Sequence, residues 1–205
     1  MPRDGKITRT KILDAAQEAI LGYGYGGTSI DMLLAKTGIT KGAFFYHFKS
    51  KAELARALLE RYVESDRRML EDCMGRAEKL SREPLPQLLI FLELLLEMFE
   101  SMKSPYSCLF ASYYYQEELF DDEVKQRISD TVRSWRLRVG DKLRAIAEKQ
   151  APRMPVDLDS VADNLTAVLE GAFIMSKTYN DGGMIASQFR HYKNYIELLF
   201  MAENS

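Results

Sequence analysis

The fold is decided by residues 28–51, TSIDMLLAKTGITKGAFFYHFKSK. This pattern predicts a helix of about eight residues, a short turn and a second short helix, which together make a helix-turn-helix. Thr28 is expected to cap the first helix. Gly38 stands where that helix must end, because glycine adopts the left-handed conformation at little cost. Thr40 is then expected to cap the second helix, residues 41–47.

Composition predicts a globular protein with a packed core. The chain has 205 residues, of which 46% are hydrophobic and 28% are charged. No apolar stretch is long enough to cross a bilayer, and the N-terminus lacks the pattern of a signal peptide. Cys73 and Cys108 lie far apart in the sequence and predict neither a disulfide nor a metal site. We therefore expect a cytoplasmic protein that does not associate with membranes.

Charge is distributed unevenly along the chain. Residues 1–56 hold nine Lys and Arg against five acidic residues, whereas the remainder holds 19 basic and 25 acidic residues. A basic N-terminal part on an acidic body is typical of a protein that meets a polyanion with one end. Ordinary scatter in surface charge is the alternative.

Apolar residues at helical spacing predict helices over the rest of the chain and no strands. The glycine-rich run 22–27 lacks a GxxxxGK[ST] pattern and a preceding strand, so it is interpreted as a turn rather than a nucleotide-binding loop. The expected helices run from about Thr8 to the glycine run, from Ser50 to about Leu80, over Leu85–Met102, from Ser104 to about Glu118, from Asp121 or Asp122 to about Gln150, from Asp157 or Asp159 to about Asp181, and over Ile185–Ala202.

Catalytic motifs are absent from the sequence. The two histidines, His47 and His191, lie in different predicted helices without HExxH spacing. There is no GxSxG or CxxC pattern, and the carboxylates fall at helix caps or on charged faces. We therefore predict that the chain is not an enzyme and holds no cofactor or metal.

The segment GGTSIDMLLAKTGITKGAFFYHFKSKAEL resembles the DNA-binding signature of the TetR family of bacterial transcriptional regulators. The AKTGI turn, the KGA start of the second helix and the YHFKSK exit into a long helix coincide in register. The detailed match covers about residues 8–60, and beyond it the likeness is one of architecture. It implies an all-α fold of about nine or ten helices, with a three-helix DNA-binding domain over residues 1–50 and a helical regulatory and dimerisation domain over residues 51–205.

The resemblance implies a role for each matching residue of the helix-turn-helix. Lys41 would donate to a guanine and Phe44 would touch a thymine methyl group. The family commonly has Tyr at the position of Phe45, so that phosphate contact is lost here and Tyr46 is expected to compensate. Phe45 and Phe48 are expected in the core. The implied contacts are with phosphates for Thr28, Tyr46, His47 and Lys51, and with base edges for Thr40, Lys41, Gly42, Ala43 and Phe44.

The resemblance also implies two partners for the helical body. One is a second copy of the chain, bound through the helices near 121–150 and 157–181, where Ala167 and Gly171 permit close helix approach. The other is a small-molecule effector held among Met and aromatic side chains. The same residues can instead be plain core. The candidate lining is Phe91, Leu95, Met98, Phe99, Met102, Phe110, Tyr113, Tyr114 and Trp135.

These observations lead to one functional hypothesis and one alternative. The hypothesis is a dimeric repressor that binds a palindromic double-stranded DNA operator and is released by a small molecule. The alternative is a helical ligand-binding protein or enzyme whose helix-turn-helix is only structural.

Overall fold

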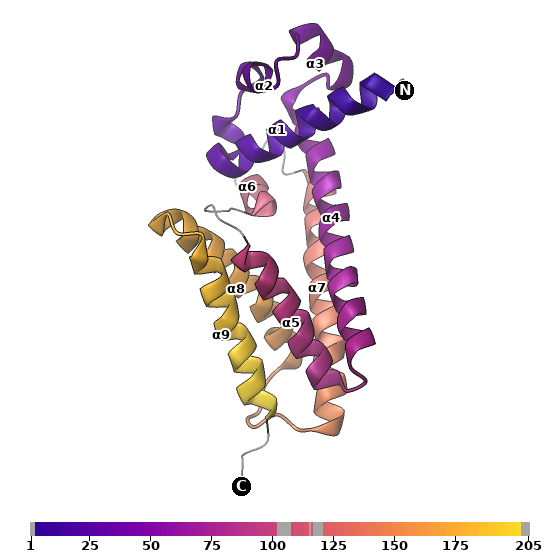
Figure 1. Cartoon of the computed structure of the whole chain (residues 1–205), viewed down its shortest axis with the longest axis vertical. Helices are drawn as coiled ribbons and strands as arrows, with labels where there is room; N and C mark the ends of the chain where they lie inside the picture. Colours follow the sequence, from indigo (N-terminus) through magenta and orange to yellow (C-terminus); the bar gives the residue numbers. More distant parts are fainter. Residues whose placement is uncertain (1–2, 102–107, 115, 117–120, 202–205) are drawn as a thin grey trace. The chain divides into compact units, whose positions relative to one another are not determined.

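The computed structural model describes residues 3–101, 108–114, 116 and 121–201, without the side chains of residues 3, 4 and 114. Within these ranges the regular secondary structure is entirely helical, which confirms the predicted all-α fold. Two of the expected effector contacts, Met102 and the side chain of Tyr114, lie outside the described part. The described helices are α1 (Arg3–Gly27), α2 (Ile30–Thr37), α3 (Lys41–His47), α4 (Lys51–Leu80), α5 (Pro84–Glu100), α6 (Leu109–Tyr114), α7 (Asp122–Lys149), α8 (Leu158–Tyr179) and α9 (Gly183–Phe200) (Figure 1).

The chain divides into two compact units. Unit 1 comprises Met1–Ser65 and Ser107–Ile128, and unit 2 comprises Asp66–Tyr106 and Ser129–Ser205. Helices α4 and α7 each contribute residues to both units. The predicted boundary between domains 1–50 and 51–205 stays a prediction.

Unit 1 is built around α1, which packs against α2 and α6. Its core includes Ile12 and Phe44, both fully buried. The hydroxyl of Tyr113 on α6 donates to the carbonyl oxygen of Ala55 on α4 at 2.7 Å, and burial raises the pKa of this phenol. A buried phenol needs such an acceptor, so this bond fixes α6 on the first half of α4.

In unit 2, helix α9 packs along both α5 and α8 (Figure 1). The core contains nearly the whole of α5, because Leu and Phe surround that helix. The hydroxyl of Tyr192 on α9 donates to the carbonyl oxygen of Val161 on α8 at 2.9 Å. No described helix combines the length and the apolar content needed to span a membrane.

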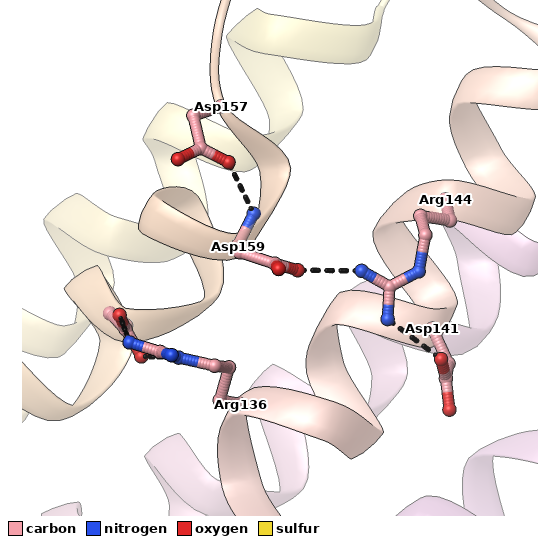
Figure 2. A network of polar contacts seen from close by, with 6 residues as sticks. Arg136, Asp141, Arg144, Asp157 and Asp159 are labelled. Atoms are coloured by element: carbon pink, nitrogen blue, oxygen red, sulfur yellow. Dashed lines mark hydrogen bonds and ion pairs between the residues drawn. The ribbon is translucent and has the colours of Figure 1, made fainter. Parts of the chain in front are cut away.

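Ion pairs join α7 to α8 outside this core (Figure 2). Arg136 binds the carboxylate of Asp163 with two nitrogens. Arg144 donates to Asp159 at 2.6 Å and to Asp141, on its own helix, at 2.8 Å. These pairs are exposed to solvent, so they define the register of the two helices more than they stabilise the fold.

Most of the described helices begin and end close to the residues predicted from the sequence. Asp121 caps α7 by accepting from the N–H of Val124, and Asp157 caps α8, which settles the two open alternatives. The expected start at Thr8 is wrong, because α1 already begins at Arg3. Inside the glycine run the backbone leaves helical geometry at Gly24, where φ is 75°. Only glycine adopts this conformation without strain, so the predicted turn is present.

Candidate nucleic-acid interface

The turn between α2 and α3 is closed by local hydrogen bonds. Ser29 caps α2, because its hydroxyl accepts from the N–H of Met32 at 3.1 Å. Gly38 ends that helix with φ of 67°, as predicted. Thr40 caps α3 by accepting from the N–H of Ala43 at 3.2 Å, also as predicted. Each cap satisfies a backbone group that the helix end would leave unpaired, so the seven-residue α3 starts at a fixed point.

Thr28 has a different role from the predicted one. Its side chain is 2% exposed, and its hydroxyl donates to the carbonyl oxygen of Gly24 at 2.9 Å. Its backbone N–H donates to the carbonyl oxygen of Tyr25 at 3.2 Å. Thr28 therefore closes the kinked end of α1. The expected capping of α2 is wrong, and burial of the hydroxyl contradicts the expected phosphate contact.

Phe44 faces the interior of unit 1. The residue is 0% exposed, and its ring centroid lies 6.1 Å from that of Phe48, itself 1% exposed. The part-buried ring of Phe45 meets Phe44 edge-on at 5.3 Å. The expected contact of Phe44 with a thymine methyl group is therefore wrong. Residues four apart share a helix face, so the spacing of Phe44 and Phe48 was the signal that pairs them in the core.

The opposite side of α3 is polar and open to solvent. Thr40, Lys41 and Gly42 are exposed, Ala43 is part-buried, and Tyr46 is 63% exposed. A Cβ atom added at Gly42 would meet no atom within 4 Å in the part of the chain that the structure describes. We define this outer face of α3 as Thr40, Lys41, Gly42, Ala43 and Tyr46. Its side chains are short except for one cation and one phenol, so a flat, anionic surface can approach the backbone closely.

Two further basic residues flank the outer face, each beside an aromatic ring. His47 meets Tyr46 edge-on at 5.0 Å, and its buried Nδ1 has no hydrogen-bond partner among the described residues. The ammonium nitrogen of Lys51 lies 4.0 Å from the ring centroid of Tyr25. Such a cation–π contact holds the charge without neutralising it. His47 and Lys51 therefore place groups that can bind anions beside the outer face.

The sequence-based interpretation missed one residue at this surface. Lys49 is exposed just beyond α3, and its ammonium group donates to the carbonyl oxygen of Phe45 at 3.1 Å. Its backbone N–H donates to the carboxylate of Glu53 at 2.7 Å. A cation near the last carbonyls of a short helix is a recognisable sequence signal. Lys49 extends the basic border of the outer face.

The residues expected to hold an effector are divided between the two units. Phe91, Leu95, Phe99 and Trp135 are buried in the core of unit 2, whereas Phe110 and Tyr113 are buried in unit 1. Met98 is 37% exposed on α5. The hydroxyl of Tyr113 is already bonded within its unit. An effector contact remains a prediction for each of these residues.

A surface depression of about 310 Å³ is lined by residues of α8 and α9, none of which is among those candidates. Its lining mixes polar and apolar side chains, with Tyr195 as the one aromatic residue. The lining residues are Ser160, Val161, Asp163, Asn164, Ala167 and Tyr195.

Comparison with known proteins agrees with this geometry. The family model described as bacterial regulatory proteins, tetR family, matches residues 12–58. The model described as a tetracyclin repressor-like C-terminal domain matches residues 84–192. The two matches contain the helix-turn-helix and most of unit 2, respectively. The chain is therefore a helix-turn-helix transcriptional regulator.

More particularly, the chain belongs to the tetR family of bacterial regulatory proteins. An uncharacterized HTH-type transcriptional regulator of Lactococcus lactis subsp. lactis is 24% identical over 192 residues, which are 93% of each chain. TtgR, an HTH-type transcriptional regulator of Pseudomonas putida, is 33% identical over 99 residues, 48% of this chain and 44% of that protein. A tetR-family regulator from Agrobacterium tumefaciens shares the fold with a TM-score of 0.75 at 20% identity, covering 96% of this chain and all of that one.

Proposed function

We propose that the protein is a cytoplasmic, homodimeric repressor that binds an inverted-repeat DNA operator through α3 and catalyses no reaction. The main observation behind this proposal is that α3 has one buried side and one exposed side. Phe44 and Phe48 anchor one side in the core, while Lys41, Gly42 and Tyr46 are exposed on the other. A helix held in this way can enter a major groove, which is wide enough for one helix.

The outer face divides into base-reading and phosphate-binding groups. We assign base edges to Thr40, Lys41, Gly42 and Ala43, with Lys41 donating to guanine O6 or N7. Gly42 supports close approach, because nothing in the protein occupies the space of its missing side chain. The hydroxyl of Tyr46, 63% exposed, supplies the phosphate donor that Phe45 lacks.

His47, Lys49 and Lys51 complete the phosphate contacts on the borders of this face. Each cation that neutralises a phosphate releases a counterion, so binding is expected to weaken steeply as salt rises. Contacts of this kind set register and orientation, while sequence choice stays with the base-reading group.

The dimer is assigned to α8 together with α9. The sequence suggested α7 and α8, but the apolar residues Trp135, Val139 and Leu143 of α7 are buried inside their own unit. The outward side of α8 carries no charge along Ser160, Asn164, Ala167, Gly171 and Ile174, the last 64% exposed. Charged residues are rare at the centre of protein–protein interfaces, so this uncharged side of α8 is a suitable interface.

Helix α9 continues this neutral surface. Leu198 is 66% exposed and lies one turn beyond Tyr195, which borders the depression on α8. A Cβ atom at Gly171 would meet no atom of the described residues within 4 Å, so a second helix has room there. An obligate dimer is expected to bury roughly 2,000 Å² or more.

Analytical ultracentrifugation tests the assignment of the dimer. Ile174→Glu on α8 is expected to give a monomer, because a charge would be buried at the centre of the interface. The matched control is Leu137→Glu, which places the same charge at a 53% exposed position on α7 and should leave the dimer intact. A dimer with Ile174→Glu and a monomer with Leu137→Glu would return the interface to α7.

Release by an effector completes the proposal. The first half of helix α4, from Lys51, belongs to unit 1, and its second half, from Asp66, belongs to unit 2. This helix therefore connects the unit that contains α3 to unit 2 along the chain. An effector releases DNA only if it binds the non-DNA state more tightly, since equal affinity for both states shifts nothing.

Titration with the DNA beside the protein's own gene tests DNA binding directly. Lys41→Ala should weaken binding to an inverted repeat by about tenfold or more at fixed salt. The matched control is Lys79→Ala, which removes one exposed cation from unit 2 and should leave affinity unchanged. Equal affinity of both variants and the unmodified protein would favour a helix-turn-helix with a purely structural role.

A further inference from the structure

Four basic residues at the start of the chain have no part in the function proposed so far. Positions 1–13 hold Arg3, Lys6, Arg9 and Lys11 against one acidic residue, Asp4. The other basic residues of positions 1–56 either surround the outer face of α3 or pair with carboxylates elsewhere in unit 1. The excess of positive charge at the start of α1 therefore needs an explanation of its own.

The first two turns of α1 lie against the end of α3 (Figure 1). A Cβ atom added at Gly5 would lie 3.8 Å from Cε1 of the His47 ring. The guanidinium carbon of Arg9 lies 5.0 Å from the ring centroid of Phe48, the residue that ends α3. Gly5 and Arg9 are four positions apart, and residues four apart share one face of a helix. This face of α1 is therefore the one that meets α3.

The charges of Lys6 and Arg9 are available to a partner. Lys6 is exposed and lies three positions before Arg9, so the two side chains are neighbours on the surface of α1. Arg9 is part-buried, because its guanidinium group covers the Phe48 ring. A cation–π contact of this kind leaves the positive charge in place. Within the described ranges of the chain, neither residue forms an ion pair with a carboxylate.

These two cations continue the basic border of the outer face of α3. Arg9 contacts Phe48, and the next residue, Lys49, already belongs to that border. Gly5 brings the start of α1 against His47, which flanks the outer face. Basic side chains therefore extend from Lys49 across the end of α3 to the first two turns of α1. Each strand of a duplex carries one negative charge per about 3.4 Å of helix axis, so neighbouring cations can meet neighbouring phosphates.

A purely structural role explains these residues less well. The Phe48 ring needs cover from solvent, but an apolar side chain at position 9 would supply it without a charge. Lys6 covers no aromatic ring and forms no ion pair among the described residues, so its charge adds nothing to the packing of unit 1. An isolated exposed lysine is ordinary solvated surface. Lys6 differs because it lies beside a helix that is proposed to enter DNA.

We propose that Lys6 and Arg9 bind the DNA backbone beside the outer face of α3, so that α1 shares in holding the duplex. This inference deepens the proposed function and rests on it. The two cations meet phosphates beyond the His47 end of α3 and make no contact with bases. They therefore raise the affinity for every duplex by the same factor, and the choice of sequence stays with the base-reading group around Lys41.

The salt dependence of DNA binding tests this inference. Fluorescence anisotropy measures the affinity of the whole chain for the inverted-repeat operator and for an unrelated duplex of the same length, at a series of KCl concentrations. Lys6→Gln removes one phosphate contact from each protomer, so the slope of log affinity against log salt should be shallower by about 2 for the dimer. Affinity should fall by about tenfold or more for both duplexes, with the ratio between them unchanged.

Lys11→Gln is the matched control on the same helix. Lys11 is exposed and lies two positions from Arg9, and two positions turn a side chain by about 200°. Lys11 therefore points away from the end of α3, and its variant should keep the slope of the unmodified protein. Arg9→Gln should show the shallower slope, and Arg9→Lys, which restores the charge, should recover it. Circular dichroism checks that each variant is folded.

The outcomes separate this inference from the function on which it rests. If the unmodified protein binds the operator and both Lys6→Gln and Arg9→Gln keep its slope, the inference is overturned and the proposed repressor stands. If the unmodified protein binds neither duplex, the proposed function fails and this inference fails with it. If Lys6→Gln weakens binding to the operator alone, Lys6 contacts bases and the assignment to phosphates is wrong.

Discussion

The outer face of α3 and the carboxylate of Asp66 on α4 differ in how a charge is exposed to solvent. On α3, Lys41 and Tyr46 are exposed, while the phenylalanines beneath them form the core. The part-buried carboxylate of Asp66 on α4 accepts a hydrogen bond from the indole N–H of Trp135 on α7 at 2.7 Å, and no cation pairs with it among the described residues. An exposed charge costs folding little and is available to any polyanion, whereas a part-buried charge without a counterion destabilises the fold. The first arrangement leaves charge available to DNA, and the second makes the stability of the fold depend on pH.

The largest expected effect separates the two sides of α3. Phe44→Ala should lower the free energy of unfolding by about 3–5 kcal/mol, because it empties a fully buried ring site. Tyr46→Ala should change it by no more than about 0.5 kcal/mol, because the ring is mostly exposed. Urea unfolding measures both. Equal losses for the two variants would mean that α3 is not two-sided.

The next effect concerns Asp66 and depends on pH. The folded state raises the pKa of this carboxyl from 3.8 to about 6, so the fold binds the proton more tightly than the unfolded chain does. Stability from this group is present below pH 3.8 and is lost as pH rises through 6. Asp66→Asn should therefore be more stable than the unmodified protein by about 1–3 kcal/mol at neutral pH.

The stability gain of Asp66→Asn should shrink as the pH falls below 6, where the native carboxyl takes up its proton. Chemical unfolding at a series of pH values measures it. A variant that is less stable at neutral pH would show that the charge is already balanced within the chain.

Removing the charge of Glu78, on the same helix, is expected to have a smaller effect on stability and one of opposite sign. Burial raises the pKa of this carboxyl, but hydrogen bonds from Lys142 and Arg138 outweigh burial and lower it below 4.5. Stability from this pair is therefore present at neutral pH and lost as the pH falls. Glu78→Gln should lower the free energy of unfolding by under about 1 kcal/mol at neutral pH. The same pH series measures it, and a gain in stability would remove the contrast with Asp66.

The residues that begin or end several helices were predictable from the sequence. The caps at Thr40, Asp121 and Asp157 and the left-handed Gly38 follow from rules that involve only neighbouring residues. The error at Thr28 was a shift of one residue, since Ser29 beside it has the same capping chemistry. The sequence-based prediction placed Phe45 in the core and Phe44 toward DNA, whereas Phe44 is the fully buried residue of the two. The error was in deciding which face of α3 points to the core.

Features that depend on distant residues were not predictable. Asp66 looks like one more surface carboxylate until α7 places Trp135 beside it. The family resemblance assigned α7 to the dimer interface, and the sequence could not test this, because periodicity shows that a face is buried but not what covers it. Packing inside unit 2 supplies that answer.

Gly42→Ala tests most directly whether the outer face of α3 reads DNA. The added methyl group meets no protein atom, and alanine favours a helix over glycine by about 1 kcal/mol, so the fold should be as stable as before or slightly more stable. Affinity for the inverted-repeat operator should nevertheless fall by about tenfold or more, because the methyl group stands between backbone and bases. Unchanged DNA affinity in a folded Gly42→Ala protein would contradict the placement of this face in the groove.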